Sequence, residues 1–387
     1  MADKTADNDL ANARDADDAP NPARGLLTGL LLTGAAIGAA ALTNAYLFYK
    51  TPPLTSKLPG GEVRYFPTAD GDVFYKKKGD GPPLLLVHAV GAGCSSYEWL
   101  QTWDALSEEY TVYALDLLGF GKSDKPQQTY TADKYLTLLD AFCRDVIKVG
   151  DGRGETDVIA TSLSAAYIVA LAARDPALFR RLVLVCPTGI EELAKPPSGR
   201  AEFGRGLLSA PVLGTSIYNA ITSKAGIRNY MQTRLFADPH TATDAMVDAY
   251  YVAAHQPGGE NALPSFLSGL LNIDIKDDWA RVVDLPLIVW GQQATESPVS
   301  HAEAFVKGNP HAKLEVIENA GMLPHVEQPE AFLAAVRPFL AMADEGGGAV
   351  YDVPHDDAPH DDEPAGAGTL RGEFGEETET ITADSVA

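Results

Sequence analysis

A serine with the surroundings of a nucleophile lies near the middle of the chain. The segment ATSLS, residues 160–164, stands between an apolar run typical of a buried strand and a helical pattern. A sharp turn there presses strand and helix together, so the positions two residues to either side must be small, as Ala160 and Ser164 are. Held in such a turn, the Ser162 hydroxyl can attack a carbonyl carbon once a base removes its proton. The alternative for Ser162 is an ordinary helix N-cap.

Two further segments widen the pattern around this serine. The segment HAVGAG begins at His88 after another buried strand, and the segment DLLGFGKSDKP covers residues 116–126. The second segment resembles the loop after the fourth strand in epoxide hydrolases, haloalkane dehalogenases and related enzymes of the α/β-hydrolase superfamily. The resemblance extends over about residues 71–341, and ATSLS resembles the nucleophile elbow of that superfamily, GxSxG, with both glycines replaced.

The resemblance implies a type of chemistry. Epoxide hydrolases and haloalkane dehalogenases use an aspartate nucleophile, whereas this chain has Ser162. It is therefore similar to the serine branch of esterases, lipases, C–C bond hydrolases and cofactor-free haloperoxidases, and we expect neither dehalogenation nor a cofactor. HAVGAG resembles the HGxG loop, which implies that the amides of Val90 and Leu163 form an oxyanion hole. His88 is expected to organise this loop.

The residues that should activate the serine are missing. The superfamily pattern has an Asp three residues after the Gly that ends the seventh strand, where this chain has Ala294. It has a His directly after the Gly that follows the eighth strand, where this chain has Met322. Without a base a serine hydroxyl is a poor nucleophile, and losing a triad member costs several powers of ten in rate.

Other residues could substitute for the missing pair. His325, three residues after Met322, is the candidate base, and its alternative role is that of a solvent-facing residue at the start of the last helix. Glu296 is the candidate acid, with Glu191 and Glu192 as further candidates because some hydrolases place the acid after the sixth strand. Surface ion pairs or roles at the hinge of the cap are the alternatives for these carboxylates.

The elements that must position these residues follow from the apolar pattern. Short apolar runs alternate with helical stretches, which predicts a mostly parallel, eight-stranded sheet with helices on both faces, the α/β-hydrolase fold. The expected core comprises residues 61–189 and 280–343. Residues 190–279, inserted after the sixth strand and helical in their apolar spacing, predict a cap over the site.

The N-terminal region predicts a membrane anchor. Residues 25–49 contain no charged side chain, and about 20 apolar residues cross a bilayer as a helix. A cleaved signal peptide is the alternative, but the preceding segment is acidic and no clear cleavage site follows. Basic residues balance on the two sides, so the sequence does not tell on which side of the membrane the hydrolase domain lies. Residues 50–60 predict a linker.

Charge and composition limit the remaining functions. Residues 1–24 and 344–387 are acidic and predict disordered termini, because they offer little apolar surface to bury. The formal net charge of −23 argues against nucleic acid as a partner. The three cysteines lack the spacing of metal ligands, so no metal site is predicted.

Two functional hypotheses follow, and a scaffolding role through the anchor and the tail is a third. In the first, the protein is a membrane-anchored serine hydrolase that uses Ser162 on a hydrophobic ester-like substrate. In the second, it is a non-catalytic α/β-hydrolase that binds a hydrophobic ligand or a partner. The elbow and the cap favour the first hypothesis, whereas Ala294 and Met322 favour the second. The sequence leaves the oligomeric state open.

Overall fold

The structure is a computed structural model of the chain that describes residues 22–149, 155–195, 199–282 and 286–342, with the side chains of 22–32 and 200–203 left out of the description. The predicted acidic tail, 344–387, lies outside the described residues. So do residues 1–21 of the predicted N-terminal segment, whereas residues 22–24 already belong to the first helix.

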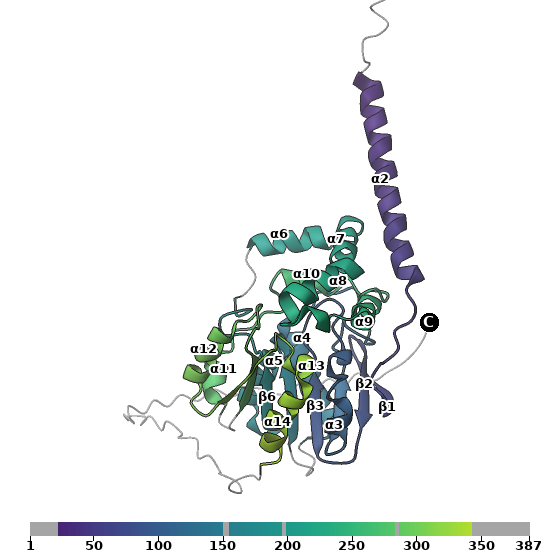
Figure 1. Cartoon of the computed structure of the whole chain (residues 1–387). Coiled ribbons are helices and arrows are strands. Elements are labelled where there is room, and N and C mark those ends of the chain that lie inside the picture. Colours follow the sequence, from purple (N-terminus) through teal and green to yellow (C-terminus); the bar gives the residue numbers. More distant parts are fainter. Residues whose placement is uncertain (1–21, 150–154, 196–198, 283–285, 343–387) are drawn as a thin grey trace, which may run out of the picture. The chain divides into compact units, whose positions relative to one another are not determined.

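Eight strands form one sheet in the order β1-β2-β4-β3-β5-β6-β7-β8 (Figure 1). The strands are β1 Glu62–Thr68, β2 Gly71–Lys78, β3 Pro83–Val87, β4 Thr111–Leu115, β5 Thr156–Thr161, β6 Phe179–Val185, β7 Leu287–Gly291 and β8 Lys313–Ile317. Strand β2 pairs antiparallel with β1 and β4, and all other pairs are parallel. The predicted eight-stranded, mostly parallel sheet is confirmed.

Helices cover both faces of the sheet, as a parallel sheet requires. The helices of the sheet domain are η1 Ser96–Trp99, α3 Trp103–Ser107, α4 Ala132–Ala141, α5 Leu163–Arg174, η3 Pro176–Leu178, α11 Lys276–Arg281, η6 Val299–His301, α12 Ala302–Gly308, α13 Pro324–Glu327 and α14 Pro329–Leu340. Helix α4 continues into a π-helical turn, η2 Phe142–Ile147. The hydroxyl of Thr131 accepts a hydrogen bond from the amide of Lys134 and so caps the start of α4.

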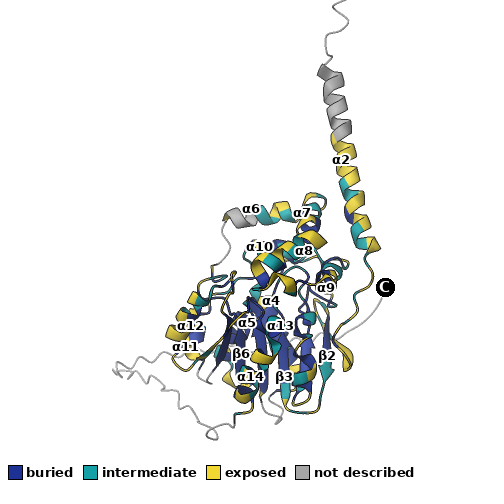
Figure 2. Cartoon of the chain, viewed as in Figure 1, coloured by how far each residue is buried: buried dark blue, intermediate teal, exposed yellow. Residues whose placement is uncertain are grey.

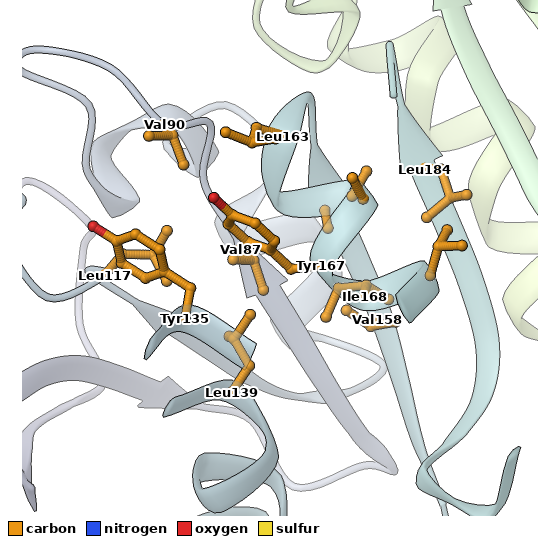
Figure 3. Packing of buried hydrophobic residues seen from close by; sticks show 14 of the residues in the cluster. Val87, Val90, Leu117, Tyr135, Leu139, Val158, Leu163, Tyr167, Ile168 and Leu184 are labelled. Carbon is orange, nitrogen blue, oxygen red and sulfur yellow. The ribbon is translucent and has the colours of Figure 1, made fainter. Parts of the chain in front are cut away.

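Two hydrophobic cores flank the sheet. The core around helices α4 and α5 contains Tyr135, Leu139 and Tyr167, which pack against strand residues such as Val87 and Val158 (Figure 3). The core on the other face contains side chains of α3 and α14. Strands β3 and β5 are buried along nearly their whole length because helices cover them from both sides, and the middle of the sheet is largely dark blue in Figure 2.

The predicted cap segment contains a series of helices between β6 and β7. They are α6 Gly199–Leu208, α7 Leu213–Ile221, α8 Lys224–Tyr230, the π-helical η4 Met231–Leu235, η5 Pro239–Thr241, α9 Asp244–Ala254 and α10 Leu263–Leu267. Several hydrogen bonds join this segment to the sheet domain. The hydroxyl of Tyr167 on α5 donates to the carbonyl of Leu271, and the amide of Tyr130 donates to the hydroxyl of Ser265.

The predicted membrane span falls within α2, Pro22–Lys50. Over the part of the chain that the structure describes, no helix combines the length and the apolar character needed to cross a membrane. The structure therefore does not support the predicted span. Toward its end α2 contacts the cap: Asn44 donates to the carbonyl of Val212 and the hydroxyl of Ser216, and it accepts from Asn219.

Candidate active site

Ser162 lies in a strained turn between β5 and α5. Its φ of 55° and ψ of −121° are rare for a residue with a side chain, and such a backbone costs about 1–3 kcal/mol unless its surroundings impose it. The amide of Ser162 donates to the carbonyl of Val185 on the neighbouring strand at 2.9 Å, which fixes the turn. The side chain of Ser162 makes no capping hydrogen bond, so it does not act as an ordinary N-cap.

The small residues beside the serine allow this turn. Ala160 and Ser164 are both fully buried, and the hydroxyl of Ser164 donates to the carbonyl of His88 at 2.6 Å. A larger side chain at either position would separate β5 from α5. The elbow and the HAVGAG loop are therefore joined by a direct hydrogen bond.

His88 organises the HAVGAG loop. Its Nε2 accepts a hydrogen bond from the amide of Leu117 at 3.0 Å, so the ring proton must be on Nδ1. That Nδ1–H donates to the carbonyl of Ala89 at 2.7 Å. With both ring nitrogens engaged by backbone, His88 has no free nitrogen with which to abstract a proton from a substrate.

The two predicted oxyanion donors lie beside Ser162. Val90 lines the same cavity as the serine, and Leu163 is the first residue of α5. Among the described residues, neither amide donates a hydrogen bond to another group of the chain. Both N–H groups can therefore stabilise a negative charge that develops on a carbonyl oxygen.

A cavity of about 370 Å³ lies next to the half-buried Ser162. Its sheet-domain lining includes Ala89, Val90 and Ser162. Apolar side chains on the cap side are Ile221, Ile227, Met231, Leu235, Leu263, Phe266 and Leu267. A cavity of this size and lining can hold a small ligand that is mostly apolar.

The structure places His325 elsewhere than either sequence-based expectation. Its side chain is fully buried on α13, so the solvent-facing alternative is wrong. Its Nε2 lies 3.1 Å from Oε1 of Glu98, and its ring stacks on Trp99 with centroids 4.4 Å apart. Its Nδ1 is buried without a partner among the described residues. His325 is thus bonded to Glu98 and not to Ser162, because the short helix α13 directs the ring toward η1.

Glu98 is the residue that the sequence analysis missed. It is 2% exposed on η1, it lines the cavity, and its Oε2 accepts a hydrogen bond from the amide of Ala89 at 2.9 Å. Burial raises the pKa of this carboxyl, but the hydrogen bond and the charge of His325 outweigh burial, so the pKa lies below its ordinary value. The signal in the sequence was its position between Tyr97 and Trp99, where a lone carboxylate enters an apolar run.

Met322 and Ala294 occupy the positions of the missing triad histidine and aspartate. Met322 is 5% exposed and lines the cavity, and its Sδ accepts a hydrogen bond from the amide of Ser297 at 3.4 Å. Ala294 is buried. Because a thioether does not take up a proton at neutral pH, Met322 cannot act as the base for Ser162.

The carboxylates predicted as substitute acids have basic neighbours. Glu296 lines the cavity and lies 3.8 Å from Nε of Arg234. Glu192 also lines the cavity, and its Oε2 lies 2.6 Å from Nδ1 of His301. Oε2 of Glu191 lies 3.1 Å from Nε2 of the same histidine. None of these contacts links a carboxylate to His325.

Two other kinds of chemistry find no support in the described residues. No cluster of three or more His, Cys, Asp or Glu side chains suited to a metal ion occurs there. Cys94 lines the cavity, but burial, assisted by the charge of Glu98, raises the pKa of its thiol far above the ordinary value. A thiol in that state is a poor nucleophile.

Comparisons with known proteins agree with this fold. A family model described as alpha/beta hydrolase family matches residues 84–335. A 2-hydroxy-6-oxo-6-(2'-aminophenyl)hexa-2,4-dienoic acid hydrolase of Metapseudomonas resinovorans is 26% identical over 302 residues, which are 76% of this chain and 96% of the relative.

Solved structures give the same result. A serine hydrolase involved in carbazole degradation superposes with a TM-score of 0.61 at 21% identity, covering 73% of this chain and 100% of the other. A membrane phospholipase A superposes with a TM-score of 0.58 at 24% identity, covering 82% of this chain and 97% of the other. The relatives in these comparisons include hydrolases of several kinds, and this chain belongs to the alpha/beta hydrolase family.

Proposed function

We propose that this protein is a serine hydrolase, tethered to a membrane by its N-terminal segment, that cleaves a hydrophobic ester-like substrate through Ser162. One observation carries the proposal: a serine in a strained elbow lines a mostly apolar cavity next to two unengaged backbone amides. A protein that needed only the fold would gain stability by relaxing that turn.

The reaction would follow from the groups around the serine. Oγ of Ser162 attacks the carbonyl carbon, the carbonyl oxygen becomes negative, and the amides of Val90 and Leu163 stabilise it. The hydroxyl proton passes to a carboxylate of the cavity, which returns it to the leaving alcohol as the ester C–O bond breaks. Water then attacks the acyl group on Ser162 in the same way and releases the acid. Glu98 is our choice for this carboxylate, because His325 keeps it ionised beside the oxyanion loop.

The resulting enzyme would be slow. A carboxylate whose pKa is lowered holds a proton weakly, so Glu98 would assist less than the imidazole of an ordinary triad. We expect a rate several powers of ten below that of enzymes with a complete triad. His325 then acts through Glu98 and has no contact with the serine.

A fluorophosphonate probe tests the nucleophile directly, because it reacts with an activated serine and needs no knowledge of the substrate. We expect Ser162 to be labelled, and the label to disappear in Ser162→Ala and persist in the matched control Ser300→Ala, an exposed serine. Hydrolysis of p-nitrophenyl butyrate should likewise be lost in Ser162→Ala and persist in Ser300→Ala. Absence of labelling at Ser162 under conditions that label an ordinary serine esterase would refute the proposal.

The tether is tested separately in the full chain. Residues 25–49 carry no charge, so the expressed protein should stay with membranes after an alkaline carbonate wash. Replacing Leu31 and Leu32 with Lys should release it. Release of the unmodified chain by the wash would exclude a spanning anchor.

The second candidate function is ligand binding without turnover. Met322 favours it, because it occupies the position of the family's histidine and lines the cavity. Turnover that depends on Ser162 would exclude this alternative.

A further inference from the structure

The charges that line the cavity are all negative. Its described lining contains the carboxylates of Glu98, Glu192 and Glu296, and it contains no Lys, Arg or His. The remaining residues of the lining are apolar or carry neutral polar groups. A ligand in this cavity therefore meets carboxylates without meeting a cationic side chain.

The basic partners of these carboxylates lie outside the lining. Glu98 contacts His325 at 3.1 Å, Glu192 lies 2.6 Å from Nδ1 of His301, and Glu296 lies 3.8 Å from Nε of Arg234. These groups hold the carboxylates and compensate part of their charge. Because these basic residues do not line the cavity, an anionic ligand there would meet the carboxylates and not their partners.

The same lining contains the buried hydroxyls of Thr188 and Ser297. Oγ1 of Thr188 and Oγ of Ser297 are shielded from solvent and form no hydrogen bond with the described residues. Leaving a buried hydroxyl unpaired is costly, so a group of the ligand or water should fill this role. With Ser162 they form a polar part of an otherwise mostly apolar cavity.

We infer that this cavity binds amphiphiles whose polar end carries no negative charge, and that it rejects carboxylates. An uncharged carbonyl or hydroxyl can pair with the hydroxyls of Thr188 and Ser297, and an ammonium can also pair with the glutamates. A carboxylate could accept hydrogen bonds from the amides of Val90 and Leu163, but it would lose its hydration shell, face three glutamates and gain no cation in return. This inference rests on the proposed use of the cavity as the substrate site.

Rejection of carboxylates would distinguish this protein from one of its relatives. The hydrolase of Metapseudomonas resinovorans is named for a dienoic acid, which carries a carboxylate. An acid of that kind should fit this cavity poorly. The substrate here would be a neutral or cationic ester or amide with an apolar body.

Binding measured apart from turnover tests the inference. Three probes share a phenylbutyl body and differ in the polar end: 4-phenylbutan-1-ol, 4-phenylbutylammonium and 4-phenylbutanoate. Titration calorimetry would use the full chain in lipid nanodiscs, with empty nanodiscs as the blank. We expect the carboxylate to bind at least about tenfold more weakly than the better of the other two, a factor that corresponds to about 1.4 kcal/mol.

A charge-neutralising variant shows whether the cavity glutamates cause the preference. Glu296→Gln should narrow the gap between the carboxylate and the other probes. Glu303→Gln, at an exposed surface position paired with Lys307, should leave the gap unchanged. Because Glu296 is 43% exposed in its side chain, its replacement should not disturb folding.

The outcomes separate this inference from the proposed function. Binding of the carboxylate as tight as that of the alcohol and the ammonium would overturn the inference, and so would failure of all three probes to bind. A preserved preference in a protein whose Ser162 resists the fluorophosphonate would support the inference and refute the proposed hydrolase activity. Turnover of esters whose acyl part carries a free carboxylate, at the rate of neutral esters, would support the proposed hydrolase activity and refute the inference.

Discussion

Replacing His325 with Leu should destabilise the protein strongly, because it removes the partner of a buried charge. Glu98 and His325 are 2% and 0% exposed, and their atoms Oε1 and Nε2 are 3.1 Å apart. Leucine has a similar volume but removes the imidazole that contacts the Glu98 carboxylate, while the Ala89 amide remains as a donor. Leaving a buried carboxylate without its partner costs about 3–5 kcal/mol in free energy of unfolding, and we expect a loss in that range at pH 7.

The loss should shrink as the pH falls. In the wild-type protein the pKa of Glu98 is below its ordinary value, so this group contributes stability above the unfolded pKa and loses it as the pH falls through the folded pKa. In His325→Leu burial is no longer opposed by His325, and the pKa of Glu98 should rise. The variant then gains a proton on folding, and its deficit relative to wild type should diminish between about pH 7 and pH 5.

Urea unfolding of the full chain in one detergent, followed by tryptophan fluorescence, measures both effects. His325→Gln is the matched control, because its amide can donate to Glu98 but carries no charge. It should lose less stability than His325→Leu. The reasoning is refuted if His325→Leu costs under about 1 kcal/mol at pH 7, or if its deficit does not change with pH.

Three further changes test other parts of the site. Gly93→Ala should destabilise the fold by about 1–3 kcal/mol in urea unfolding, because φ is +82° and the new Cβ would lie 2.6 Å from the carbonyl oxygen of Tyr250. The control Gly204→Ala should not destabilise the fold, because open space surrounds this glycine. Ser164→Ala should cost about 1–3 kcal/mol and lower esterase activity, because it leaves the buried carbonyl of His88 without its donor; unchanged kcat/KM would contradict the link between elbow and loop. The double change Ala294→Asp with Met322→His should raise kcat/KM on p-nitrophenyl butyrate by about 100-fold or more, and no gain would show that Met322 does not lie where a base can reach Ser162.

Much of the fold could be predicted because it depends on local pattern. The alternation of apolar runs and helical stretches indicated the mostly parallel sheet. The small residues around Ser162 indicated a tight turn, and the structure has it at φ 55°. Such features depend on neighbours in the sequence, so they are legible without the tertiary structure.

The pairing of His325 could not be predicted in the same way. Its partner Glu98 is 227 residues away, and only the packing of α13 against η1 brings them together. The sequence suggested Ser162 as the partner because the family pattern has its histidine nearby. The contact with Trp99, at 4.4 Å between ring centroids, instead fixes the imidazole beside η1.

The two functional hypotheses differ in whether the hydroxyl of Ser162 gives up its proton to a base. In both, a carbonyl or a similar acceptor of a bound ligand can reach the amides of Val90 and Leu163, and the strained turn at Ser162 serves that contact whether or not a bond forms. Met322 removes the usual base but not the oxyanion hole, since backbone amides do not depend on that side chain. Whether the protein turns over its ligand or only binds it therefore depends on whether Glu98 accepts the proton of Ser162, because Glu98 is the one deeply buried carboxylate in the described lining of the cavity.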